Sequence, residues 1–315
     1  MMNRYLREFS TGVTLAFLLA IMAITAPAFF HLSNLWELLV NNAAMLVIGI
    51  GMTLVILAGH IDISIGSQFA IASVVTGVLA KEGLPVPVAA LGGILAAGLL
   101  GSINGVLVAG LGIPSIVVTL ATMIGLRNCL RWVTEGRWVQ DLPLNFQWAG
   151  LGQAGGEALI LLTAIFVFAV FQWASTNLQA MRLLYATGSN PEAARLAGIR
   201  PPRIFFGVFV AMGLLTGLAA AMNAMRFSEV QGNAGVGLEM QAIAAVVVGG
   251  ASITGGRATI FGTVLGVLLL AVIGPALTFA GISAFWEKAI QGSVILAAVL
   301  MDARGKRRPH VTAIP

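Results

Sequence analysis

The sequence predicts an all-α membrane protein with about ten transmembrane helices. Three observations carry this prediction: 58% of the 315 residues are hydrophobic, only 9% are charged, and the mean hydropathy is +0.96. A soluble domain usually carries about 25% charged residues, so no soluble fold of this length could bury so much apolar surface. The 38 glycines fit membrane helices, because small residues let backbones approach where lipid supplies no hydrophobic drive.

Ten candidate spans result when the sequence is cut at charges, prolines and glycine clusters. About 20 apolar residues are needed to cross the hydrocarbon core. The candidates are residues 13–30, 41–59, 65–80, 86–108, 115–129, 158–175, 204–224, 239–250, 259–277 and 285–301. We expect them to form a single transmembrane domain over residues 1–315.

The basic residues predict the orientation, because cytoplasmic loops of membrane proteins carry an excess of Lys and Arg. With the N-terminus inside, eleven fall inside, namely Arg4, Arg7, Arg182, Arg195, Arg200, Arg203, Arg257, Arg304, Lys306, Arg307 and Arg308. Six fall outside, namely Lys81, Arg127, Arg131, Arg137, Arg226 and Lys288. Both termini are therefore expected in the cytoplasm, and the stretch 127–157 is expected to be an external, partly amphipathic loop. The net charge of +5 forms no basic stripe, so no nucleic-acid partner is expected.

Several kinds of chemistry have no support in the sequence. The single cysteine, Cys129, excludes an intrachain disulfide, and three histidines, His31, His60 and His310, form no cluster at metal-ligand spacing. No G-x-x-x-x-G-K-[ST] nucleotide loop and no arrangement of nucleophile and base occurs. We therefore expect no catalytic residue, metal or cofactor, and not an enzyme.

Two predicted spans are interrupted by segments with a glycine at each end, residues 59–66 and 249–256. The two glycines of each segment are seven residues apart, and the segments are offset by 190 residues. This spacing, and the same predicted direction of the flanking spans, indicates a weak parallel internal repeat, a symmetry from which many transporters are built.

Polar and ionisable residues at or near membrane depth are candidates for the solute pathway, because an ionisable group there is costly. The alternative for the acids Asp62 and Glu239 is that each satisfies backbone amides at a helix end, and for Asp62 capping is at least as well supported as solute contact. Polar residues of spans also hydrogen-bond neighbouring helices, and His60 is more often an interfacial histidine than a proton relay. The full set of pathway or broken-helix candidates is His60, Asp62, Ser64, Gly66, Asn104, Thr119, Thr122, Glu239, Gln241, Gly249, Gly250, Gly255 and Gly256.

The loop between residues 175 and 203 predicts a short capped helix. Asn190 can cap it, Pro191 is tolerated at its first position, and Gly198 can end it. A helix of under about 12 residues is marginal alone in water, so we expect it to dock, either onto a partner subunit or along the protein's own cytoplasmic face. Its residues are Asn190, Pro191, Glu192, Ala193, Ala194, Arg195, Leu196 and Gly198.

Three of these stretches carry a resemblance to a known family. Residues 59–67, 185–199 and 237–256 resemble, in the same order and at the same position relative to the spans, the permeases of the ribose, xylose, rhamnose and autoinducer 2 importers. The resemblance covers nearly the whole chain. The segment 135–143, with Glu135, Gly136, Arg137, Trp138, Val139, Leu142 and Pro143, looks closest to the autoinducer 2 and rhamnose branch.

The resemblance implies a permease subunit of an ATP-driven (ABC) importer for a small sugar or sugar-like solute in a bacterial inner membrane. Its partners would be cytoplasmic ATP-binding subunits, a second permease copy or a similar permease, and a periplasmic solute-binding protein. Hydrolysis would then take place on another chain, and the helix 190–198 would couple to it. The alternatives are an ABC permease for nucleosides or branched-chain amino acids, and a membrane scaffold or intramembrane enzyme. An ion-coupled secondary transporter has thin support, because no span carries paired carboxylates.

Overall fold

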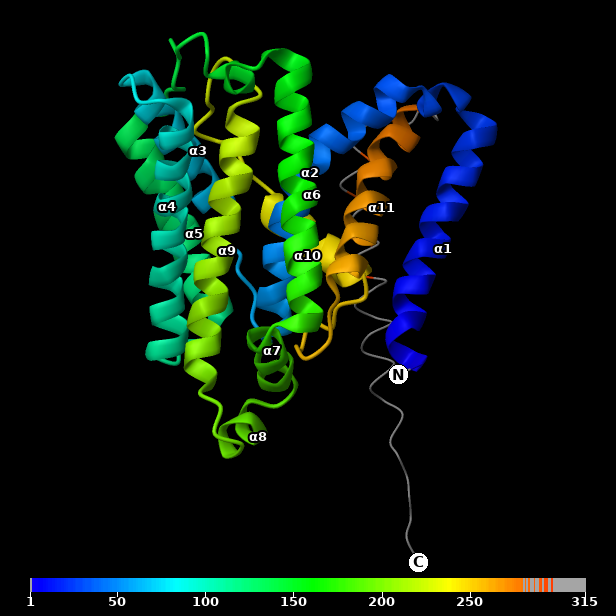
Figure 1. The fold of residues 1–315 in the computed structure, drawn as a ribbon, viewed down its shortest axis with the longest axis vertical. Coiled ribbons are helices and arrows are strands. Elements are labelled where there is room, and N and C mark those ends of the chain that lie inside the picture. Colours follow the sequence, from blue (N-terminus) through cyan, green and yellow to red (C-terminus); the bar gives the residue numbers. More distant parts are fainter. Residues whose placement is uncertain are drawn as a thin grey trace, which may run out of the picture.

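The computed structural model describes residues 2–279 together with residues 281, 283, 286, 289, 290, 292, 293 and 296. The predicted span 285–301 lies largely outside these residues, and the basic residues 304–308 lie wholly outside them. Over the described residues the chain is nearly all helical, and the β pairing found there is one isolated antiparallel bridge between Val139 and Val230 (Figure 1).

Nine helices of this part of the chain correspond to the nine predicted spans that fall within it. They are α1 (Met2–Thr25), α2 (Leu32–Leu57), α3 (Ile65–Lys81), α4 (Val86–Gly105) with its continuation η2 (Val106–Gly110), α5 (Ser115–Thr134), α6 (Gly152–Asn177), α9 (Pro201–Ala224), α10 (Leu238–Val248) and α11 (Ile260–Phe279). Seven are long and apolar enough to cross a membrane, whereas α3 and α10 are shorter. The remaining elements are η1 (Pro27–Phe30), η3 (Gln147–Gly150), α7 (Gln179–Ser189) and α8 (Pro191–Leu196). The predicted all-α membrane fold is confirmed.

Helix α2 forms the centre of the bundle. All its residues from 47 to 57 are buried, and it packs against α9, α6, α11 and α10. A helix that is apolar all round belongs inside a protein, which accounts for the position of α2.

Glycines allow the extensive contact between α4 and α9. A Cβ atom on Gly217 would lie 2.6 Å from the Cα of Ile94, and one on Gly101 would lie 3.0 Å from the Cα of Gly213. Any larger side chain would push these helices apart. Glycine therefore acts here as the packing residue that the composition predicts.

Helices α3 and α10 begin within the bundle rather than at either end of it (Figure 1). Non-helical segments lead into both, residues 58–64 after α2 and residues 225–237 after α9. The two helix starts meet. A Cβ on Gly66 would lie 2.6 Å from Oε2 of Glu239, and one on Gly235, whose φ is +76°, would lie 2.7 Å from the carbonyl oxygen of Gly66.

Different elements lie at the two ends of the bundle (Figure 1). The start of α1, α7 and α8 lie at one end, and the loop between α5 and α6 lies at the other. This loop begins later than predicted, because α5 continues to Thr134. The prediction of an external loop from residue 127 was wrong for Arg127 and Arg131, which lie on α5. Their charges pointed to a loop, although an arginine can be held on a membrane helix when a neighbouring backbone accepts its hydrogen bonds.

Candidate functional site

Helix α8 has the capped form that the sequence predicts. The side-chain oxygen of Asn190 accepts a hydrogen bond from the amide of Ala193 at 3.0 Å, Pro191 opens the helix, and Gly198 follows it with a φ of +82°. These are the contacts that satisfy the free backbone groups at the two ends of a helix.

The exposed side of α8 presents two charges and one large apolar side chain. Glu192 and Arg195 form an ion pair at 3.2 Å, and both side chains are mostly exposed. Leu196 is 85% exposed, whereas Ala194 is buried. The buried alanine holds α8 against the protein and leaves the other three side chains free for contact with a partner.

The residues before α8 pack against two other segments. We call this contact the glycine junction; it consists of Leu57, Gly59, Gly188, Gly255 and Gly256. Gly188 of α7 packs directly on the carbonyl of Leu57, and the amide of Gly256 donates to that carbonyl at 2.9 Å. A Cβ on Gly255 would lie 2.8 Å from the Gly188 oxygen and 2.8 Å from the Cα of Gly59. Both interrupted segments therefore meet α7 at its last turn.

A side-chain bond strengthens this contact. The hydroxyl of Tyr185 on α7 donates to the carbonyl of Ala258 at 2.8 Å, in the loop between α10 and α11. The other two predicted glycines of this loop lie just before the junction: Gly249 packs on Gly262 of α11, and Gly250 takes a φ of +100°. Because α8 follows α7 directly, α8 is connected through these contacts to the end of α2 and to the loop between α10 and α11.

Beyond Gly59, the first segment ends in a buried polar network at the start of α3. Asp62 Oδ1 accepts from the Ser64 amide at 2.9 Å and from the Ser64 hydroxyl at 2.6 Å. The side-chain amide of Gln68 donates to Asp62 Oδ2 at 3.3 Å and to the Ser64 hydroxyl at 2.7 Å, and Asn104 of α4 donates to the same hydroxyl at 2.8 Å. All four residues are buried, and Asp62 holds the backbone of Ser64, the residue before α3, rather than an amide of the helix itself. Sequence reasoning missed Gln68, which lies one turn after Ser64.

Three further predicted residues make internal contacts. The ring of His60 lies edge-on against Phe205, with ring centres 4.3 Å apart. Thr119 of α5 donates to the carbonyl of Ile61 at 3.3 Å, and Thr122 donates to carbonyls of its own helix. These contacts hold the first segment between α5 and α9.

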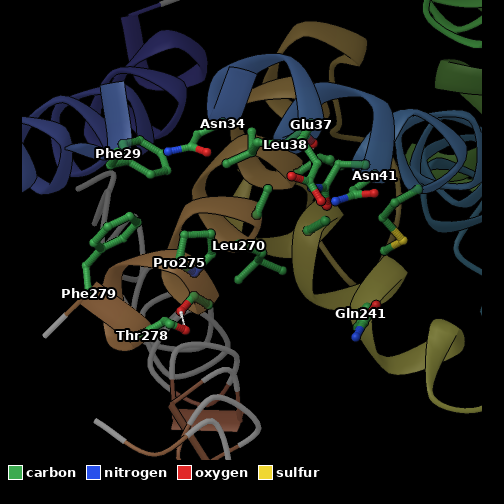
Figure 2. Close-up of a pocket in the computed structure, with 16 residues that line it drawn as sticks. Phe29, Asn34, Glu37, Leu38, Asn41, Gln241, Leu270, Pro275, Thr278 and Phe279 are labelled. Carbon is green, nitrogen blue, oxygen red and sulfur yellow. Dashed lines mark hydrogen bonds between the residues drawn. The ribbon is translucent and has the colours of Figure 1, made fainter. Parts of the chain in front are cut away.

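Helix α10 carries the other two predicted polar residues on different sides. Gln241 lines a cavity of about 530 Å³ between α2, α10 and α11. Figure 2 shows its amide with polar side chains of α2 around the same space. The polar lining residues are Asn34, Glu37, Asn41, Asn42, Gln241 and Thr278.

Glu239 faces α3 and α5 instead. Its Oε2 and the Nη2 of Arg127 lie 2.6 and 3.3 Å from the point where a Cβ of Gly66 would stand. Arg127 Nη1 also donates to the carbonyl of Ala234 at 2.8 Å. Sequence reasoning placed Arg127 in a loop, although an arginine between apolar residues of one span was the signal for this site.

A protein-family model described as "Branched-chain amino acid transport system / permease component" matches residues 34–299. The chain belongs to this permease family. The matched range includes α2 to α11, so the glycine junction, the network around Asp62 and the pair Arg127 and Glu239 all lie in the family's permease region.

Among its relatives, this permease is 34% identical over 309 residues to the ribose import permease protein RbsC of Escherichia coli K12, covering 95% of this chain and 94% of the relative. It is 31% identical over 298 residues to the autoinducer 2 import system permease protein LsrC of Enterobacter sp. strain 638, covering 95% and 87%. The LsrC of Escherichia coli K12/DH10B is 35% identical over 294 residues, covering 92% and 86%. No solved structure matches the chain.

Proposed function

We propose that this permease is the membrane subunit of an ATP-driven importer for a small sugar or sugar-like solute. Relatives of nearly the same length are named for the import of ribose and of autoinducer 2, which supports a solute of this class. The 135–143 segment favours the autoinducer 2 and rhamnose branch. Because the identities to RbsC and LsrC are similar, the solute itself has to be determined by experiment.

The observation that carries the proposal is that α8 is exposed while the residues before it are packed tightly against two membrane segments. Helix α8 exposes Leu196 together with a Glu192–Arg195 ion pair, while the glycine junction ties the preceding residues to two membrane segments. A large apolar side chain that is 85% exposed on a helix outside the bilayer fits a docking surface. A displacement of α8 would reach the end of α2 and the loop between α10 and α11 through the junction.

The proposed assembly follows from this arrangement. Cytoplasmic ATP-binding subunits would dock at α8 and hydrolyse ATP there, so that this chain needs no catalytic residue. The protein would lie in a bacterial inner membrane with both termini in the cytoplasm, as the eleven to six distribution of basic residues indicates. A periplasmic solute-binding protein would deliver solute at the opposite end, and a second permease copy or a similar permease would complete the assembly.

Replacing Leu196 with Asp tests the docking role. The variant places an acid in an apolar contact, where an unpaired buried charge is costly, so we expect the ATP-binding subunit to be lost on co-purification and ATP-driven uptake to fall to background. The matched control is Gln179→Asp, which adds an acid at the exposed start of α7 and should retain both. Undiminished binding and uptake with Leu196→Asp would mean that α8 is only surface structure.

A further inference from the structure

One face of the bundle, formed by α5 and the start of α10, is left uncovered by the described chain. Ile124 on α5 is 55% exposed, and Val236 and Met240 around the start of α10 are 70% and 62% exposed. Two ionisable side chains, Arg127 and Glu239, lie half-buried on this face. The face is therefore apolar around these two charges, and the exposed Arg131 lies one turn further along α5.

The depth of these charges limits what can cover the face. Glu239 lies in the first turn of α10, which begins within the bundle (Figure 1), and Arg127 lies on α5 seven residues before its end. A charged side chain facing hydrocarbon is costly, and ionisable residues inside membrane proteins instead face water-filled pathways or pair with one another. Lipid alone therefore does not fit this face.

The backbone around the two charges is held in place from both sides. Gly66 and Gly235 bring the starts of α3 and α10 into contact, and Arg127 fixes the chain before α10 through its bond to Ala234. In many transporters the solute binds where interrupted helices begin, close to the midplane of the membrane. Here that position carries a guanidinium and a carboxylate side by side.

We propose that Arg127 and Glu239 contact the solute on its way through the membrane and recognise its hydroxyl groups. A guanidinium only donates hydrogen bonds and a carboxylate only accepts them, so two neighbouring hydroxyl groups can accept from Arg127 and donate to Glu239. This inference rests on the proposed import function and names the residues that would recognise its solute.

The test must separate solute contact from a structural role of the two charges. Arg127→Met/Glu239→Leu also removes the Arg127 bond to the Ala234 carbonyl, which is worth about 1 kcal/mol, so the double variant should still assemble with its partner subunits and unfold only slightly below the wild-type temperature. The importer, reconstituted in proteoliposomes with its solute-binding protein, is assayed for uptake of D-ribose and of autoinducer 2. Uptake should fall at least about tenfold, the effect of losing charge-assisted hydrogen bonds.

The control is Lys81→Met/Glu82→Leu, which removes one charge of each sign from exposed residues at the end of α3 and should keep wild-type uptake. Glu239→Gln, which is nearly isosteric, serves as the second variant if the double variant fails to assemble, and it should also lower uptake. Wild-type uptake in either variant overturns the inference while leaving the import function standing. If the wild-type importer takes up neither compound on adding ATP, the proposed function itself fails.

Discussion

The two glycine-bounded segments, 59–66 and 249–256, share their spacing but differ in what lies between the glycines. In the first, Asp62 and Ser64 are buried and hydrogen-bonded to α3 and α4. In the second, Thr254 is exposed, and a tight turn is closed by a bond from the Ser252 amide to the Arg257 carbonyl at 2.8 Å. The first segment is thus an anchor inside the bundle and the second is a loop at its end.

The comparison teaches that the glycines mark where backbones must touch, whereas the residues between them decide the role of the segment. Gly255 touches Gly59 and Gly188 of α7, and the Leu57 carbonyl just before the first segment also packs on Gly188, so both segments are connected to the helix that leads into α8. In Figure 1 both follow a helix that runs toward the α8 end and precede one that runs away from it. This agrees with the direction expected of a parallel repeat, and the repeat itself stays a prediction.

Breaking the contact that the two segments share should have the largest effect on stability. A Cβ at Gly188 would overlap the Leu57 carbonyl, which belongs to backbone and cannot turn away, so Gly188→Ala should lower the free energy of unfolding by roughly 3 kcal/mol, the upper range for overpacking. Thermal unfolding of the purified permease measures it.

The control for Gly188→Ala is Gly207→Ala in α9, where a Cβ would meet no atom within 4 Å. This variant should unfold at the wild-type temperature. Equal unfolding temperatures for both variants would show that α7 is not tightly packed on the two segments, and the proposed transmission from α8 would lose its basis.

Breaking the anchor of the first segment alone should have an intermediate effect. Asp62→Ala leaves the amide and hydroxyl of Ser64 buried without their acceptor, which costs about 2 kcal/mol. Asp62→Asn keeps an acceptor for Ser64, and the Gln68 Oε1 atom, which has no partner, can accept from the new amide after rotation. We therefore expect Asp62→Asn to cost about 1 kcal/mol or less, again by thermal unfolding.

The exposed acid Glu82 at the end of α3 provides the control, since Glu82→Ala should change stability by less than about 0.5 kcal/mol. The two Asp62 variants also separate a structural role from solute contact. A fully stable Asp62→Asn permease that no longer takes up solute would contradict a purely structural role and assign the carboxylate to transport.

Contacts between residues close in sequence could be predicted, whereas contacts between segments far apart in sequence could not. The caps of α8 depend on residues close in sequence, Asn190 and Gly198, so the helix could be predicted with its ends. The apolar runs likewise located every described span. The depth at which α3 and α10 begin could not be predicted, because it depends on Gly66 meeting Gly235, far away in the sequence.

The same reason explains the residues that sequence analysis missed. Gly188 looks like any glycine of a glycine-rich chain until the Leu57 carbonyl is placed against it. Arg127 was assigned to a loop because its acceptor, the carbonyl of Ala234, belongs to a segment about a hundred residues away. Every residue has a backbone carbonyl, so the sequence does not show which carbonyl will contact a given side chain or glycine. These contacts can be identified only once the fold is known.

The smallest expected effect comes from a matched pair of hydroxyl deletions, one for each segment. Tyr185→Phe removes the 2.8 Å bond to the carbonyl of Ala258, two residues after the second segment, and Thr119→Val removes the 3.3 Å bond to the Ile61 carbonyl of the first. Tyr185→Phe should cost about 1 kcal/mol, an ordinary net value for one hydrogen bond. Thr119→Val should cost less, because its longer bond shares one O–H with the carbonyl of Ser115.

Thermal unfolding of both variants and of the double variant checks this order. A larger loss for Thr119→Val would mean that the first segment depends on α5 more than on the network around Asp62, and would reverse the assignment of its anchor.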